Sequence, residues 1–156
     1  MGIDIARLRT ALPPAPSPVG LYDRGVIHRG FGVLSGQFPL AGGELSTKGR
    51  LGVEVTVDQG RAAARVAALN ALAQIDVLLE HDWSRFHRLL RLDGVVASEP
   101  GFTGQPAVLD GASELFIQLL GPAGQHARTA IGAAALPLNA PLELILTFSC
   151  HDAEVI

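Results

Sequence analysis

Arg128 stands alone in a long uncharged part of the chain and could anchor an anion. It is the only residue with a fixed charge between Glu114 and Glu143, and it opens a run of small residues that a Leu-Pro turn joins to a second apolar segment. A guanidinium group is permanently protonated and presents a planar fork that binds a carboxylate or phosphate through two hydrogen bonds. The alternative is a surface arginine whose stem lies along the end of a strand.

The other reactive residue types form no recognised catalytic or metal-ligating motif. Ser35 lacks the Gly-x-Ser-x-Gly pattern of a hydrolase nucleophile, and Cys150 is the only cysteine, which excludes an intramolecular disulfide. His126 precedes Arg128 by two residues and is expected to point to the same side of a strand. No His-Glu-x-x-His spacing occurs, so neither a metal nor a cofactor is expected. The histidines are His28, His81, His87, His126 and His151.

The composition predicts one globular domain that binds neither nucleic acid nor a membrane. The chain has 156 residues, of which 48% are hydrophobic, and a net charge of −3. Its basic residues are scattered, whereas phosphate backbones are bound by clustered basic surfaces. Pro137, Pro141 and Glu143 interrupt the most apolar stretches well short of the roughly 18 residues that span a bilayer. The N-terminal segment contains Asp4 and no apolar signal core, so a cytoplasmic location is expected.

Hydrophobic spacing and turn residues predict helices that alternate with strands. The apolar stripe Ala62, Val66, Leu69 and Ala73 indicates a helix over 59–80, with Asp58 as its N-cap. The order of the main elements, ββαβαββ, predicts an α+β domain in which both main helices cover one face of a mixed sheet, giving two layers. The predicted elements are a helix at 3–12, an extended Pro-rich link at 13–18, hairpin strands at 25–29 and 31–35 that turn at Gly30, a loop at 37–52, helices at 59–80 and 104–120, and strands at 86–97, 127–135 and 141–150.

One face of the predicted sheet carries no helix, which favours association with another subunit. Only 17% of the residues are charged, so apolar surface is available for burial. Ala130, Gly132 and Ala134 fall on one side of the penultimate strand, where small side chains let a neighbour approach closely. A dimer or trimer built on this face is expected. We divide the chain into an N-terminal helix with its Pro-rich link, 1–18, and a single domain, 19–156.

Three short blocks resemble a known family. They are Gly20-Leu-Tyr22, Ser35-Gly36-Gln37 and Arg128-Thr-Ala-Ile131, the last followed by Leu136-Pro137 and a strand with Glu143. In this order, around two helices, from about Pro18 to Cys150, the chain resembles the RidA/YjgF family of enamine and imine deaminases, also called endoribonuclease L-PSP proteins. The N-terminal helix and the segment 102–115 resemble an extended, atypical branch.

The resemblance implies a fold, an assembly and a ligand site. The fold is chorismate mutase-like, the assembly is a homotrimer, and each of three ligand clefts lies between neighbouring subunits. Arg128 matches the family arginine that holds the substrate carboxylate, and Tyr22 matches a tyrosine near the same cleft. The substrates of the deaminase branch are enamine and imine products of pyridoxal-phosphate enzymes.

Two positions depart from the deaminase pattern as the resemblance gives it. Ile145 stands where a carboxylate is expected to orient the attacking water, and Asp110 stands where an asparagine-like residue is expected. Glu143 lies two residues before Ile145 and therefore on the same side of the last strand, so it could substitute for the missing carboxylate.

Two functions follow as hypotheses. In the first, the protein hydrolyses reactive 2-imino or enamine acids to 2-keto acids and ammonia, without cofactor or metal. Arg128 is then the carboxylate anchor and Glu143 the candidate catalytic carboxylate. In the second, the same cleft binds small carboxylates such as keto acids without this catalysis. A nuclease function finds little support, because the chain is acidic and has no aromatic platform for bases. The candidate cleft is lined by Tyr22, Gly36, Arg128, Glu143 and Ile145.

Overall fold

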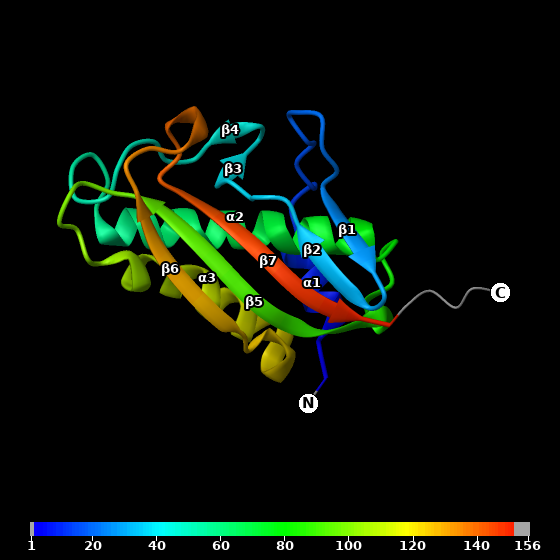
Figure 1. Ribbon diagram of the computed structural model, residues 1–156. Coiled ribbons are helices and arrows are strands. Elements are labelled where there is room, and N and C mark those ends of the chain that lie inside the picture. Colours follow the sequence, from blue (N-terminus) through cyan, green and yellow to red (C-terminus); the bar gives the residue numbers. More distant parts are fainter. Residues whose placement is uncertain (1, 152–156) are drawn as a thin grey trace.

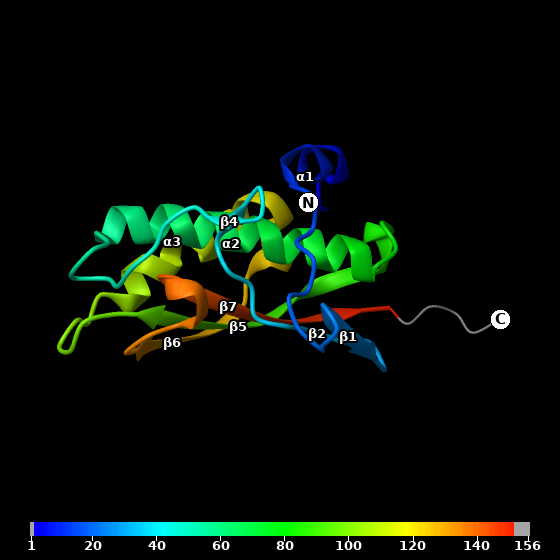
Figure 2. The same ribbon diagram turned by 90° about the horizontal axis from the view of Figure 1, so that it is seen from above.

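The computed structural model describes residues 2–151 and has two layers, a five-stranded sheet and a layer of helices on one of its faces (Figures 1 and 2). This confirms the predicted α+β class and the placement of both long helices on one side. The main elements are α1 (Ile5–Ala11), β1 (Gly25–His28), β2 (Phe31–Leu34), β3 (Leu40–Ala41), β4 (Glu44–Leu45), α2 (Val57–Leu78), β5 (Phe86–Ala97), α3 (Gln105–Leu120), β6 (Ala127–Ala133) and β7 (Leu142–Cys150).

The sheet is mixed, with strand order β1-β2-β7-β5-β6. β5 and β6 run parallel because the helix α3 connects them, and the remaining neighbours are antiparallel. β6 is an edge strand, so one side of its backbone is unpaired in a single chain. The hairpin of β1 and β2 turns through Arg29 and Gly30, whose φ angles of 48° and 76° are those of a tight hairpin turn.

The start of α2 differs from the prediction. Thr56, not Asp58, is the N-cap: its hydroxyl accepts from the Gln59 N–H, while the Gln59 side chain accepts from the Thr56 N–H. This capping box satisfies two N–H groups that would otherwise lack partners, and Asp58 lies in the first turn, where its charge suits the helix dipole.

The segment predicted as a loop, 37–52, contains the short β3–β4 hairpin. Asn70 of α2 holds it, since the Asn70 amide donates to the carbonyls of Phe38 and Leu40 at 3.0 and 2.9 Å. The buried polar side chain of Asn70 therefore finds its hydrogen-bond acceptors in the segment that packs on α2.

β7 alternates strictly between the two faces of the sheet. Leu142, Leu144, Leu146 and Phe148 are buried under the helices, whereas Glu143, Ile145, Thr147 and Ser149 form a half-buried row on the open face. This confirms the prediction that Glu143 and Ile145 lie on the same side of the last strand. Figure 1 looks onto this open face, with β7 near the middle of the sheet.

The small residues of β6 do not lie where the sequence suggested. Ala130 packs against the core under the helices, and a Cβ on Gly132 would lie 2.9 Å from the Gln105 amide nitrogen of α3. They serve close packing of α3 on the sheet, not contact with a neighbour. Ala134 lies beyond the end of β6.

The open face is instead apolar through larger side chains. Val26, Phe31, Val33 and Ile131 are each about half exposed, and strand pairing puts them on the same face as Glu143 and Thr147. The helices lie over the other face of the sheet (Figure 2). At the opposite side of the molecule α1 buries Leu8 completely in the core, and Arg9 donates to the His81 carbonyl at the end of α2. In the part of the chain described, no helix is both long and apolar enough to cross a membrane.

Candidate functional site

Arg128 faces the helices. It pairs in register with Leu92, a fully buried residue on the helix side of β5, so its side chain points toward α3. Its Nη1 donates to Asp110 Oδ1 at 2.8 Å and to Ser113 Oγ at 3.1 Å. The predicted anion site is therefore already in contact with a carboxylate of the same chain.

This ion pair is not closed off from solvent. The Arg128 side chain is 24% exposed and that of Asp110 is 46% exposed. Within residues 2–151, Nε and Nη2 of Arg128 have no hydrogen-bond partner, which leaves one edge of the guanidinium fork available to a ligand.

Ser113 links Arg128 to His126, as their two-residue spacing on β6 allows. His126 Nδ1 lies 2.6 Å from the Gly124 carbonyl oxygen, which can only accept, so Nδ1 carries the proton. Nε2 then accepts from the Ser113 hydroxyl at 3.0 Å. Burial lowers the pKa of His126; the Gly124 carbonyl opposes this and the Arg128 charge adds to it. His126 is thus held neutral, and it directs a lone pair of Ser113 toward Arg128.

Arg61 of α2 places a second cation close to Asp110, the carboxylate that pairs with Arg128. Its Nη2 lies 2.8 Å from both oxygens of Glu114, and its Nη1 is 3.9 Å from Asp110 Oδ2. α2 and α3 can bring these residues together because Gly111 packs directly on the Arg61 backbone carbonyl. Arg61, Asp110, Ser113, Glu114, His126 and Arg128 are called the Arg128 cluster below.

Sequence reasoning had missed Arg61, Ser113 and Glu114. A signal for two of them existed, since the spacing of Asp110, Ser113 and Glu114 by three and four residues puts them on one face of a helix. The position of Arg61 depends on how the two helices cross, which no local pattern gives.

A second group of predicted residues gathers on another part of the sheet. The Glu143 carboxylate lies against Gly36, where any side chain at position 36 would overlap it. Gln37 fixes this contact because its backbone N–H and C=O bond to Leu144 at 2.8 and 2.9 Å. Gly36 is required at this point by the close approach of the carboxylate, which explains a glycine in the Ser-Gly-Gln block.

Glu143 is electrostatically unusual. Burial raises the pKa of its carboxyl, and within the described residues no hydrogen bond or ion pair compensates for this. A partly buried carboxylate without a partner is a candidate acid or base.

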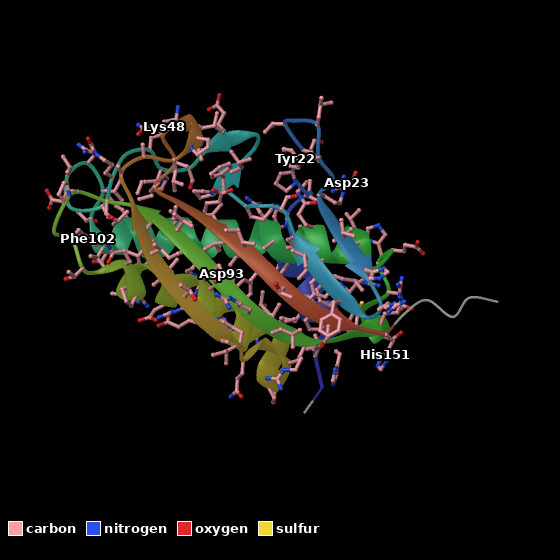
Figure 3. The ribbon with its side chains drawn as sticks, viewed as in Figure 1. Tyr22, Asp23, Lys48, Asp93, Phe102 and His151 are labelled. Carbon is pink, nitrogen blue, oxygen red and sulfur yellow. The ribbon has the colours of Figure 1, made fainter. Side chains whose placement is uncertain are left out.

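Tyr22 belongs to the same region. It shares with Gly36 and Gln37 a pocket that the Pro-rich link and Arg24 also line. Glu143 is not among the lining residues, so Gly36, which contacts the Glu143 carboxylate, is the link between Tyr22 and Glu143. Gln74 joins these walls, since it accepts from Arg24 and donates to the Pro16 carbonyl, both at 2.6 Å. Tyr22 is about half exposed, and Figure 3 shows it next to the entry into β1. Tyr22, Gly36 and Glu143 are called the Glu143 group below.

Ile145 continues the Glu143 row toward the middle of the open face. Its cross-strand neighbour is Asp93, labelled on β5 in Figure 3. Arg91 Nε lies 2.7 and 2.9 Å from the two Asp93 oxygens, and Arg91 also donates to Thr129. The carboxylate beside Ile145 is thus already paired, which leaves Glu143 as the unpaired carboxylate of this row.

The Arg128 cluster and the Glu143 group do not meet within one chain. Arg128 lies on the helix side of the edge strand β6, whereas Glu143 lies on the open side of β7, and β5 runs between them. In the described residues, no three histidine, cysteine, aspartate or glutamate side chains come together as metal ligands.

The comparisons with known proteins agree with this architecture. Residues 6–150 match the family model described as "YjgF/chorismate mutase-like, putative endoribonuclease". The chain is 38% identical to Protein TCP17 of Trypanosoma cruzi over 144 residues, 90% of this chain and 88% of that protein. The crystal structure of Atu1372 from Agrobacterium tumefaciens, a protein of unknown function, superposes with a TM-score of 0.87 at 36% identity, covering 94% of this chain and 93% of that one.

A more distant structure, E. coli TdcF with bound serine, has a TM-score of 0.62 at 18% identity, covering 86% of this chain and 92% of that one, and shares the fold. The family model spans nearly the whole chain, and the predicted resemblance is confirmed. The chain belongs to the YjgF/chorismate mutase-like family.

Proposed function

We propose that this protein hydrolyses reactive 2-imino acids to 2-keto acids and ammonia in clefts between the subunits of a homotrimer. Each cleft combines Arg128 of one subunit with the Glu143 group of the next. The observation that carries the proposal is the Glu143 carboxylate, which is partly buried beside Gly36, has a raised pKa and has no hydrogen-bond or ion-pair partner among residues 2–151.

The geometry of one chain supports a cleft shared between two subunits. Arg128 and Glu143 lie on opposite sides of the sheet, so a single chain does not direct both at one small molecule. An edge strand and a half-exposed apolar face on the same molecule give a second copy two surfaces to cover. Closed rotational symmetry would then repeat the same cleft at each subunit boundary.

Arg128 acts as the substrate anchor. Asp110 and Ser113 hold Nη1 and thereby fix the direction of the guanidinium plane. The free Nε–Nη2 edge then accepts the substrate carboxylate through two hydrogen bonds. Fixing the substrate in this way contributes to the rate by orientation alone.

Glu143 supplies the proton transfers. As a carboxylate it takes a proton from the water whose oxygen attacks the carbon of the protonated imine, which gives a neutral carbinolamine. The protonated Glu143 then returns that proton to the nitrogen and is a carboxylate again. The C–N bond breaks and ammonia leaves, while the carbinolamine hydroxyl passes its proton to Glu143, which releases it to solvent as the keto group forms. A carboxyl whose pKa is raised by burial is a better base than an exposed one, and in this proposal Glu143 replaces the carboxylate missing at position 145.

The test is the loss of an imine generated in place. A dehydratase acting on serine releases 2-aminoacrylate, and the wild-type protein is expected to accelerate its conversion to pyruvate and ammonia. Arg128→Ala and Glu143→Gln should each abolish the acceleration. Arg65→Ala should leave it unchanged, because this arginine of α2 bonds, among residues 2–151, to Gln118 alone. No acceleration by the wild-type protein would refute the proposed activity.

Ile145 favours a second candidate, a protein that binds small carboxylates without turnover. An apolar residue at this point of the open face supplies no group for proton transfer. In that case keto acids would raise the melting temperature of the wild-type protein and not that of Arg128→Ala, while imine loss would proceed at the background rate.

A further inference from the structure

We infer that Asp110 makes the Arg128 site selective for zwitterions, molecules with a carboxylate next to an ammonium or iminium group, over simple carboxylates. This rests on the proposed function for its place in the cleft and adds to it the class of ligand. The selectivity comes from the free hydrogen-bonding edges of the Arg128–Asp110 pair and from the charges around them.

The pair presents one donor edge and one acceptor edge. Nη1 donates to Asp110 Oδ1 at 2.8 Å and to Ser113 Oγ at 3.1 Å, so both of its protons are engaged. On the arginine, Nε and Nη2 have no partner within residues 2–151. On the aspartate, Oδ2 has only Arg61 nearby, at 3.9 Å and beyond hydrogen-bond distance. Asp110 is also the more exposed member of the pair.

These edges complement an α-amino or α-imino acid. The donor edge of Arg128 fits the carboxylate, and the adjacent Asp110 Oδ2 fits a cationic nitrogen on the neighbouring carbon. A 2-keto acid has a carbonyl oxygen at that place, which offers only lone pairs to a carboxylate. The same pair therefore attracts the nitrogen of the substrate and repels the oxygen of the product.

The charges of the whole Arg128 cluster support this selectivity. Arg61 and Arg128 are balanced by Asp110 and Glu114, and burial lowers the pKa of His126, which disfavours a further positive charge. A simple anion gains no net electrostatic attraction from a neutral cluster. A zwitterion is itself neutral, and its carboxylate pairs with Arg128 while its cationic nitrogen pairs with Asp110. An asparagine at position 110 would leave one positive charge in excess and favour anions.

Alanine, pyruvate and propionate test the inference, because they share one carbon skeleton and differ at C2. Calorimetric titration of the wild-type protein should show alanine binding more tightly than pyruvate or propionate. In Asp110→Asn the order should reverse, with pyruvate affinity rising about tenfold and alanine affinity falling by a similar factor, as expected for one exposed charge. Glu44→Gln removes a negative charge from β4 and should keep the wild-type order.

Equal affinities in the wild-type protein, no binding of any of the three, or an unchanged order in a folded Asp110→Asn would overturn the inference. The wild-type comparison needs no variant, so it decides the matter even if Asp110→Asn fails to fold. The two proposals also fail separately. Imine hydrolysis with no alanine preference would leave the proposed function standing alone, and an alanine preference without hydrolysis would leave the selectivity standing alone.

Discussion

A charge placed on the open face of the sheet should dissociate the proposed trimer. Val33 of β2 is 48% exposed on that face, next to Thr147 of β7. Val33→Asp replaces this apolar contact with a carboxylate that has no cation opposite it on β7. Val53, 53% exposed in the loop before α2, is the matched control position, since Val53→Asp adds the same charge away from the sheet.

The size of the effect follows from the exposure. Complete burial of a valine side chain contributes about 1.5–3 kcal/mol, so covering the exposed half of Val33 contributes about 1 kcal/mol. An unpaired carboxylate buried in an interface costs a further ~2–5 kcal/mol. The sum, at least about 3 kcal/mol per subunit, weakens association more than a hundredfold, because about 1.4 kcal/mol corresponds to a factor of ten.

Analytical ultracentrifugation at micromolar concentration measures this directly. Wild-type protein and Val53→Asp should sediment as the same trimer, and Val33→Asp should sediment as a folded monomer without imine-hydrolysing activity. The reasoning is refuted by a Val33→Asp protein that keeps the wild-type mass, or by a wild-type protein that is monomeric at every concentration.

Further substitutions probe the two halves of the cleft. Gly36→Ala places a methyl group on the Glu143 carboxylate and should lower kcat/KM at least about tenfold. The neighbouring Ser35→Ala should lower kcat/KM far less, and the imine-loss assay measures both variants. Because burial raises the folded-state pKa of Glu143, its contribution to stability is present at acidic pH and lost as pH rises through that pKa, so Glu143→Gln should raise the urea midpoint more at pH 8 than at pH 4. His126 has a lowered pKa, so its contribution is present above its unfolded pKa and lost as pH falls through the folded one; His126→Gln should flatten that acid-side loss in urea unfolding. A double-mutant cycle of Arg128→Met and Asp110→Asn, read from urea unfolding, should give a coupling of about 0.5–1 kcal/mol, and a value near zero would contradict the contact.

The strong periodic signals in the sequence predicted most of the fold. The strand at 86–97 has the predicted bounds, and the last helix and last strand differ by a residue at most. β3 and β4 were missed because strands of two residues are too short to show an alternating pattern. Asp58 was predicted as the N-cap of α2 because aspartate is a favoured residue type at that position. Thr56 is the N-cap instead, because it forms a capping box with Gln59.

The candidate site residues were named from the sequence, but their geometry could not be predicted from it. Alternation along β6 puts His126, Arg128 and Ala130 on one side, but which side faces the helices is set by pairing with β5, a tertiary contact. The sequence therefore suggested Arg128 at the mouth of the strand pair and small residues on the open face, whereas both point toward α3. The contact of Arg128 with Asp110 depends in turn on how α3 packs over that strand.

Mixing two inactive variants tests the central claim, that each cleft takes Arg128 from one subunit and Glu143 from its neighbour. The Arg128→Ala protein and the Glu143→Gln protein are each expected to be inactive when expressed alone. The two chains are then co-expressed in equal amounts. In random mixed trimers a boundary is intact only when the first chain keeps Arg128 and the second keeps Glu143, so about one quarter of the wild-type imine-hydrolysing activity should return. Mixed trimers that form and remain inactive would contradict the shared cleft.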